Sequence, residues 1–109
     1  MRYLKPIPKR LLPDDMLVWP SDGKGGFGQT RMIRHVRFEF VQAVADEPHC
    51  SADAGKGVIY VDSVNSQGAF EVPTGSRVIV GSSPSMFVKS CKRCVVIRGE
   101  VHHWELEVG

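Results

Sequence analysis

The stretch VIYVDSVNS (residues 58–66), followed by EVPTGSRVIVG (71–81) and HHWELEV (102–108), decides the fold class of this chain. These segments are short, and apolar residues alternate with polar ones along them. This period of two is typical of strands with one face against a core and one face in water. In the last segment, Trp104 and Leu106 share one face with His102 and Val108. We expect that face to be buried and the face with His103, Glu105 and Glu107 to be wet.

Further strands are predicted on both sides of this stretch. Residues 31–40 form a long one, in which Met32, Val36, Phe38 and Phe40 are expected to face the core. Ile33 and Arg34 break its alternation, which indicates a bend. The predicted strands, besides 31–40 and 102–108, are residues 16–19, 57–62, 77–80, 86–89 and 95–98.

Several short strands at even spacing, with no helical periodicity, predict an all-β fold. We expect a small antiparallel barrel or sandwich with an N-terminal arm, forming a single domain over residues 1–109. The glycine-rich segment SDGKGGFG (21–28) is interpreted as a hairpin loop, since no helix follows it to hold a phosphate. Residues 45–57 are small and polar, carry a proline and lack periodicity, so we expect a long mobile loop.

Composition limits the partners that the chain can have. No apolar run approaches the ~20 residues that cross a bilayer, and the start lacks a signal peptide's apolar core, so we expect cytoplasmic synthesis and no membrane contact. A formal net charge of +2 is too small to indicate a nucleic-acid binder by itself. Local clusters are candidates for contacts with DNA or a partner, the alternative being a solvated surface: Lys9, Arg10, Arg31, Arg34 and Arg37.

The cysteines raise the question of a metal site. Three cysteines are an odd number, which fits a reducing compartment better than a disulfide framework. Cys91 and Cys94, with His102, have the ligand types that zinc prefers. Neighbouring histidines on a strand point to opposite faces, however, so at most one joins easily. Unpaired structural thiols are the simpler interpretation, with zinc and a redox pair as the alternatives. No cofactor is predicted.

Other polar residues are assigned structural roles. Asp62 and Ser66 are expected to bond to nearby backbone in a turn, and the indole N–H of Trp104 to find a carbonyl partner in the core. The carboxylates and serines are scattered and carry no hydrolase signature, so neither catalytic residues nor enzymatic activity is predicted.

In this order, the segments resemble the small minor capsid proteins of long-tailed bacteriophages and prophages, the head-closure or stopper subunits. The resemblance covers almost the whole chain. It departs from the family pattern in the middle loop, which varies freely, and at Ser76, which follows Gly75 where the family usually carries Asp. The matching segments are PKRLLPDDMLVW (8–19), GFGQTRMIRHVRFEF (26–40), YVDSVNS (60–66), FEVPTGSRVI (70–79) and the run His102, His103, Trp104 and Glu105.

The resemblance implies a structural function without a cofactor. Such subunits are β-barrels that assemble as a ring below the portal and its adaptor, close the head, retain packaged double-stranded DNA and provide the tail platform. The implied partners are portal-adaptor and tail-joining proteins, copies of the chain itself and the DNA in the channel. The implied location is the bacterial host cytoplasm and then the virion. The implied channel loop holds Asp46, Glu47, Pro48, His49, Cys50, Ser51, Ala52 and Asp53.

Two alternatives remain open. A nucleic-acid-binding β-barrel would need exposed aromatic residues interleaved with cations, whereas Phe38, Phe40 and Trp104 fall in the register expected to be buried. A zinc-stabilised binding module would need Cys91, Cys94 and one histidine to converge.

Overall fold

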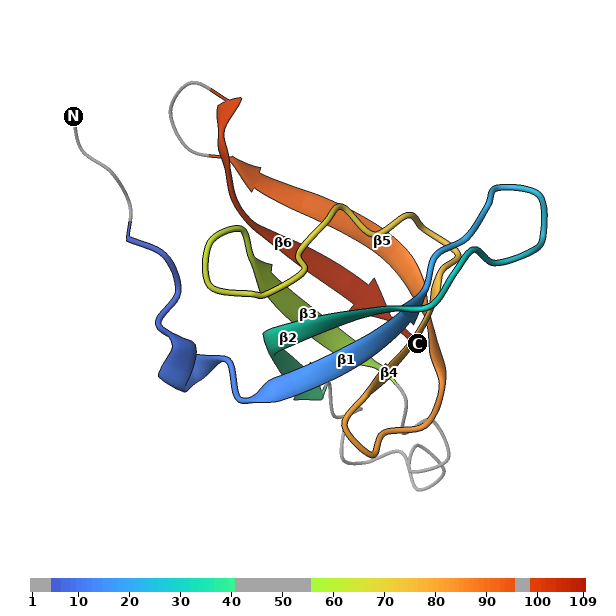
Figure 1. The fold of residues 1–109 in the computed structure, drawn as a ribbon, viewed down its shortest axis with the longest axis horizontal. Helices are drawn as coiled ribbons and strands as arrows, with labels where there is room; N and C mark the ends of the chain where they lie inside the picture. Colours follow the sequence, from blue (N-terminus) through green and yellow to red (C-terminus); the bar gives the residue numbers. More distant parts are fainter. Residues whose placement is uncertain (1–4, 41–55, 96–98) are drawn as a thin grey trace, which may run out of the picture.

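The computed structural model describes residues 5–40, 56–95 and 99–109. Six strands close into an antiparallel barrel in the order β1-β2-β3-β6-β5-β4, which confirms the all-β class and selects the barrel over the sandwich (Figure 1). One 3-10 turn, η1 (Lys9–Leu11), precedes them. The strands are β1 (Asp14–Trp19), β2 (Arg31–Phe40), β3 (Gly57–Asp62), β4 (Arg77–Val80), β5 (Met86–Val95) and β6 (Val101–Val108).

The core fills the barrel with aliphatic side chains from every strand. Val72, from the segment between β3 and β4, is also fully buried, and Phe38, Phe70, Cys91 and Trp104 pack against the core from its margin. Alternation at the end of β6 is as expected, because Leu106 and Val108 are buried while Glu107 is exposed; in the first half of the strand, residues 101–105 are all half-buried. The strand side chains of the core are Met16, Val18, Ile33, Val36, Ile59, Val61, Val78, Val80, Met86, Val88, Leu106 and Val108.

Strand β2 contains a β-bulge that reverses its alternation. Asp14 pairs with Val36 and Asp15 pairs with Arg34, which leaves His35 as the inserted residue, with φ of 62°. Ile33 and Val36 are therefore both buried although they are three positions apart. The prediction that Met32 and Phe40 face the core was wrong. Met32 precedes the bulge and points outward, and Phe40 lies at the strand end, so they are 46% and 49% exposed.

Strand β5 extends beyond the predicted strand 86–89 as far as Val95. The prediction that a strand ends at Lys89 was wrong, because Cys91 and Cys94 lie within β5 and pair with Leu106 and His103 of β6. Of the predicted strand 95–98, only Val95 lies among the described residues. Strand β6 pairs with β5 past the cysteines, with Lys92 opposite Glu105 and Arg93 opposite Trp104. Lys92 and Arg93 therefore stay in the strand and form no turn. Strands 57–62 and 77–80 have the bounds that were predicted.

The turn after β3 is built by two polar side chains, as the sequence indicated. Asp62 is fully buried, and its carboxylate accepts the backbone N–H groups of Val64 and Asn65 at 2.9 and 2.8 Å. The Ser66 hydroxyl accepts the Asp62 N–H at 2.9 Å and donates to the carbonyl of His35 in the bulge. The turn therefore joins β3 to the bulge in β2.

Candidate functional site

The N-terminal arm, residues 5–13, is fixed to one end of the barrel by hydrogen bonds between its backbone and side chains of the barrel. The Ile7 N–H donates to the Asp62 carboxylate at 3.0 Å, and the Asn65 side-chain amide donates to the Ile7 carbonyl at 2.8 Å. A ring nitrogen of His102 lies 2.6 Å from the Lys5 carbonyl oxygen. The arm is thus positioned by the turn after β3 and by the start of β6.

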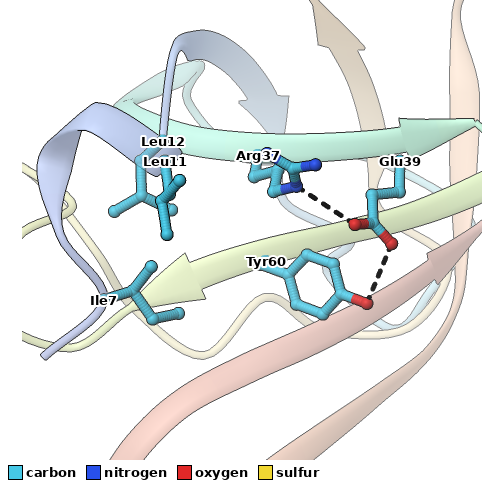
Figure 2. A pocket seen from close by; sticks show the side chains of 6 residues that line it. All are labelled: Ile7, Leu11, Leu12, Arg37, Glu39 and Tyr60. Atoms are coloured by element: carbon cyan, nitrogen blue, oxygen red, sulfur yellow. Dashed lines mark hydrogen bonds and ion pairs between the residues drawn. The ribbon is translucent and has the colours of Figure 1, made fainter.

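A shallow apolar groove lies between this arm and the outer face of the barrel (Figure 2). Its volume is about 340 Å³. Its polar side is closed by Glu39, whose carboxylate accepts from Arg37 at 3.1 Å and from the Tyr60 hydroxyl at 3.2 Å. Burial and the neighbouring Glu39 carboxylate raise the pKa of Tyr60, which keeps that hydroxyl a donor. The groove is lined by Ile7, Leu11, Leu12, Arg37, Glu39 and Tyr60.

The five basic residues singled out in the sequence lie on two elements, η1 and β2, and make different contacts. Arg31 lies over the Phe70 ring, with its guanidinium carbon 3.9 Å from the ring centre. Arg37 pairs with the Glu39 carboxylate at the groove. The exposed Lys9 and Arg10 lie on η1, which borders the same groove. Arg34 is exposed beside the bulge. A contact with DNA or a partner stays a prediction for each of them.

The structure does not bring Cys91, Cys94 and His102 together. Cys91 packs against the core, whereas Cys94, three positions later, lies on the other face of β5. The two ring nitrogens of His102 contact the ring of His103 and the Lys5 carbonyl. Burial raises the pKa of both the Cys91 and the Cys94 thiol.

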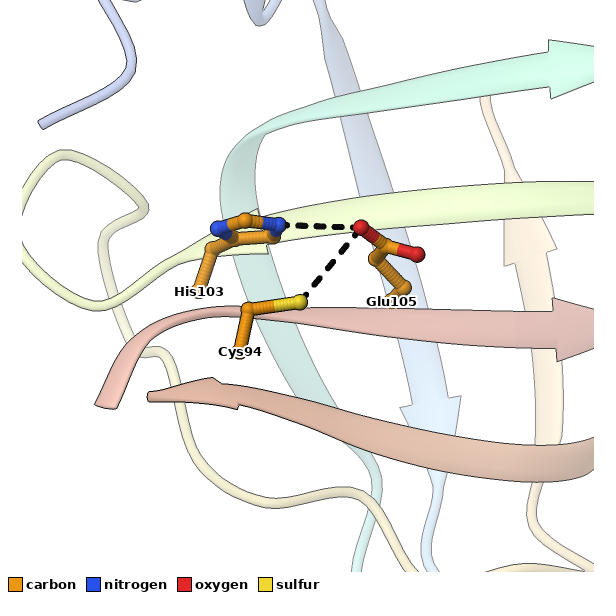
Figure 3. Close-up of side chains that lie close together, drawn as sticks. All are labelled: Cys94, His103 and Glu105. Atoms are coloured by element: carbon orange, nitrogen blue, oxygen red, sulfur yellow. Dashed lines mark hydrogen bonds and ion pairs between the residues drawn. The ribbon is translucent and has the colours of Figure 1, made fainter. Parts of the chain in front are cut away.

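Cys94 instead lies beside two residues of β6, His103 and Glu105 (Figure 3). The Cys94 sulfur is 3.4 Å from Glu105 Oε2, and His103 Nε2 is 3.1 Å from that same oxygen. The hydrogen bond with His103 holds the pKa of Glu105 below its ordinary value. Sequence reasoning missed Glu105 as a member of this cluster, because its proximity to Cys94 depends on the pairing of β5 with β6.

Trp104 packs at the margin of the core, and its partner differs from the one expected. The indole N–H donates to the Glu71 carboxylate at 3.2 Å rather than to a backbone carbonyl. Glu71 is held in place by Arg93, whose second guanidinium nitrogen donates to it at 2.9 Å. These hydrogen bonds lower the pKa of Glu71. The alternation of the sequence predicted Trp104 on the inner face. It carries no information about a hydrogen-bond acceptor on another segment, such as Glu71.

The predicted channel loop, residues 46–53, lies outside the described residues. Its described flanks are adjacent, since Phe40 pairs with Gly57 across the β2 and β3 ladder. In the described part of the chain, no helix is long and apolar enough to cross a membrane.

The geometry defines a small β-barrel domain that presents an arm, a shallow groove and loops at its surface. The family model for minor capsid proteins matches residues 8–108, so the chain belongs to the minor capsid protein family. Its role is therefore that of a structural component of a phage particle. No curated protein and no solved structure matches the chain.

Proposed function

We propose that this minor capsid protein is a head-closure subunit of the head-tail connector. Copies of the chain form a ring below the portal and its adaptor, close the filled head, retain the packaged DNA and provide the platform for the tail. The observation that carries the proposal is the family match over residues 8–108, which spans all six strands of the barrel.

The closed barrel limits how the subunits can join. Each strand has a partner on both sides, so the barrel offers little free edge to which another chain could add a strand. Contacts between subunits and with neighbouring proteins then fall to the arm, the groove, the outer sheet face and the loops. The loop over residues 20–30 projects well away from the barrel and is suited to such a contact (Figure 1).

The DNA-retaining part of the proposal concerns the segment between β2 and β3. Because Phe40 and Gly57 pair directly, this segment leaves and re-enters the barrel at one point. An insertion of that kind can extend into a channel without altering the barrel. A formal net charge of +2 is too small for strong general attraction to DNA. Closure of the channel by a ring of loops therefore fits this domain better than closure by a basic DNA-binding surface.

Deletion of the gene from the phage that carries it tests the proposal. Particles without the protein should package DNA, lose it on purification and fail to join tails, and expression of the protein in trans should restore both properties. Electron microscopy and the measured DNA content of purified heads report the two effects separately. Deletion particles that keep their DNA and carry tails would contradict the assignment.

A further inference from the structure

We infer that Cys94, His103 and Glu105 form a zinc-binding site on the outer face of the barrel. The inference goes beyond the proposed function and does not depend on it. It differs from the set suggested by the sequence, because it uses one cysteine of the CKRC motif, the second histidine and a carboxylate.

Two of the three distances between the donor atoms match those around a tetrahedral ion. Cys94 and His103 are direct cross-strand partners, and Glu105 follows two residues later on the same face of β6. Ligand distances of about 2.3 Å to sulfur and about 2.0 Å to nitrogen and oxygen place sulfur about 3.5 Å from oxygen and nitrogen about 3.3 Å from oxygen. The corresponding distances here are 3.4 and 3.1 Å, and all three atoms lie within 4.8 Å of one another (Figure 3).

The hydrogen bonds behind His103 orient a ring nitrogen of this side chain toward Glu105. The Lys5 carbonyl can only accept, so the His102 Nε2 that lies 2.6 Å from it must carry a proton. In neutral His102, Nδ1 is then an acceptor, and the His103 Nδ1 at 2.8 Å must donate to it. In neutral His103, a proton on Nδ1 leaves Nε2 without a proton and with a free lone pair.

This lone pair faces the Glu105 carboxylate oxygen at 3.1 Å, where two acceptors repel each other. The contact is satisfied by one further proton, on His102, His103 or Glu105, or by a metal ion between the two atoms. With a proton there, the Cys94 thiol still donates to the same Glu105 oxygen, and the three side chains form a hydrogen-bonded cluster. A zinc ion also binds the Cys94 sulfur, and its charge is balanced by one thiolate and one carboxylate.

The surroundings suit a bound ion. The chain from His103 through His102 to Lys5 fixes the tautomer and orientation of the ligand ring, as outer partners of metal-bound histidines do. The His103 and Glu105 side chains are 18% and 33% exposed, so a fourth position opens to solvent. The pairing of thiolate with imidazole selects zinc over magnesium or calcium. Binding releases the Cys94 thiol proton to the buffer.

Cobalt and zinc titrations of the purified chain test the site. Cys50 is first replaced by serine, so that only the thiols of Cys91 and Cys94 remain. We expect one cobalt ion per chain, with the visible absorption of a tetrahedral site and a thiolate-to-cobalt band in the near ultraviolet, both lost when zinc displaces cobalt. Cys94→Ser should abolish the thiolate band, and the matched control Cys91→Ser should keep it. His102→Ala should weaken zinc binding by about 10-fold or more.

Folding of each variant is checked by far-ultraviolet circular dichroism in the presence of a chelator. If Cys94→Ser does not fold, the chain with both thiols gives the answer, since zinc should protect Cys94 but not Cys91 from alkylation, as read by peptide mass spectrometry. Three results would each overturn the inference: no stoichiometric zinc binding, loss of the thiolate band in Cys91→Ser alone, or equal alkylation of both thiols with and without zinc.

Discussion

Replacing Asp62 by alanine should lower the free energy of unfolding by about 3 kcal/mol. Its fully buried carboxylate accepts three backbone N–H groups, from Ile7 at 3.0 Å, Val64 at 2.9 Å and Asn65 at 2.8 Å. A hydrogen bond to a charged acceptor contributes about 1.5–3 kcal/mol. The sum of three such bonds exceeds about 3 kcal/mol, but two effects reduce the loss. Water can bond to the partly exposed N–H donors after the substitution, and the desolvation cost of burying the carboxylate is no longer present. For a domain of this size the change corresponds to about 12 °C in Tm.

Urea and thermal unfolding followed by circular dichroism measure this change. Asp22→Ala is the matched control, because the Asp22 carboxylate also accepts two backbone N–H groups, from Lys24 and Gly26, but in an exposed loop. Its effect should be much smaller. Trypsin should also cleave Asp62→Ala faster in the arm, after Lys9 or Arg10, since the bond from Ile7 is lost. A Tm within about 2 °C of the parent protein, or an equal loss for Asp22→Ala, would refute the reasoning.

Three further results are expected. In urea melts, Gly68→Ala should lower the free energy of unfolding by about 2 kcal/mol more than Gly23→Ala. Both glycines have positive φ, but only a Cβ at Gly68 would meet a backbone carbonyl of β2, at 2.6 Å. Equal losses would contradict this. Trp104→Ala should lower stability by about 3 kcal/mol and Trp104→Phe by about 1 kcal/mol, because phenylalanine keeps the core contact; the reverse order would be inconsistent with the packing. Joining Phe40 to Gly57 through a turn of about four residues should leave Tm nearly unchanged, since loop length alters closure entropy slowly; a chain that fails to fold would refute this.

The sequence predicted the parts of the fold that depend on local alternation and turn residues. Strands 57–62 and 77–80 and the glycine-rich hairpin were foreseen because their patterns are short and regular. The structural roles of Asp62 and Ser66 also followed from their ordinary turn chemistry. The order of the strands and the closure of the barrel depend on contacts between distant segments, which no local pattern carries.

The errors arose where pairing with another strand overrides the local pattern. One inserted residue, His35, moved Met32 from the expected inner face to the outside. The hydrogen-bonding capacity of β6 kept the polar segment around Cys91 and Cys94 in a strand. The cluster of Cys94, His103 and Glu105 was missed for the same reason, since the proximity of its members follows from the register of β5 against β6.

An asymmetric cryo-electron microscopy reconstruction of the phage neck tests the central claim most directly. The account predicts a ring of six-stranded barrels between the portal-adaptor assembly and the tail, with the segment between β2 and β3 directed at the channel axis. Density for the barrel on the outer surface of the head shell, and none at the neck, would contradict it.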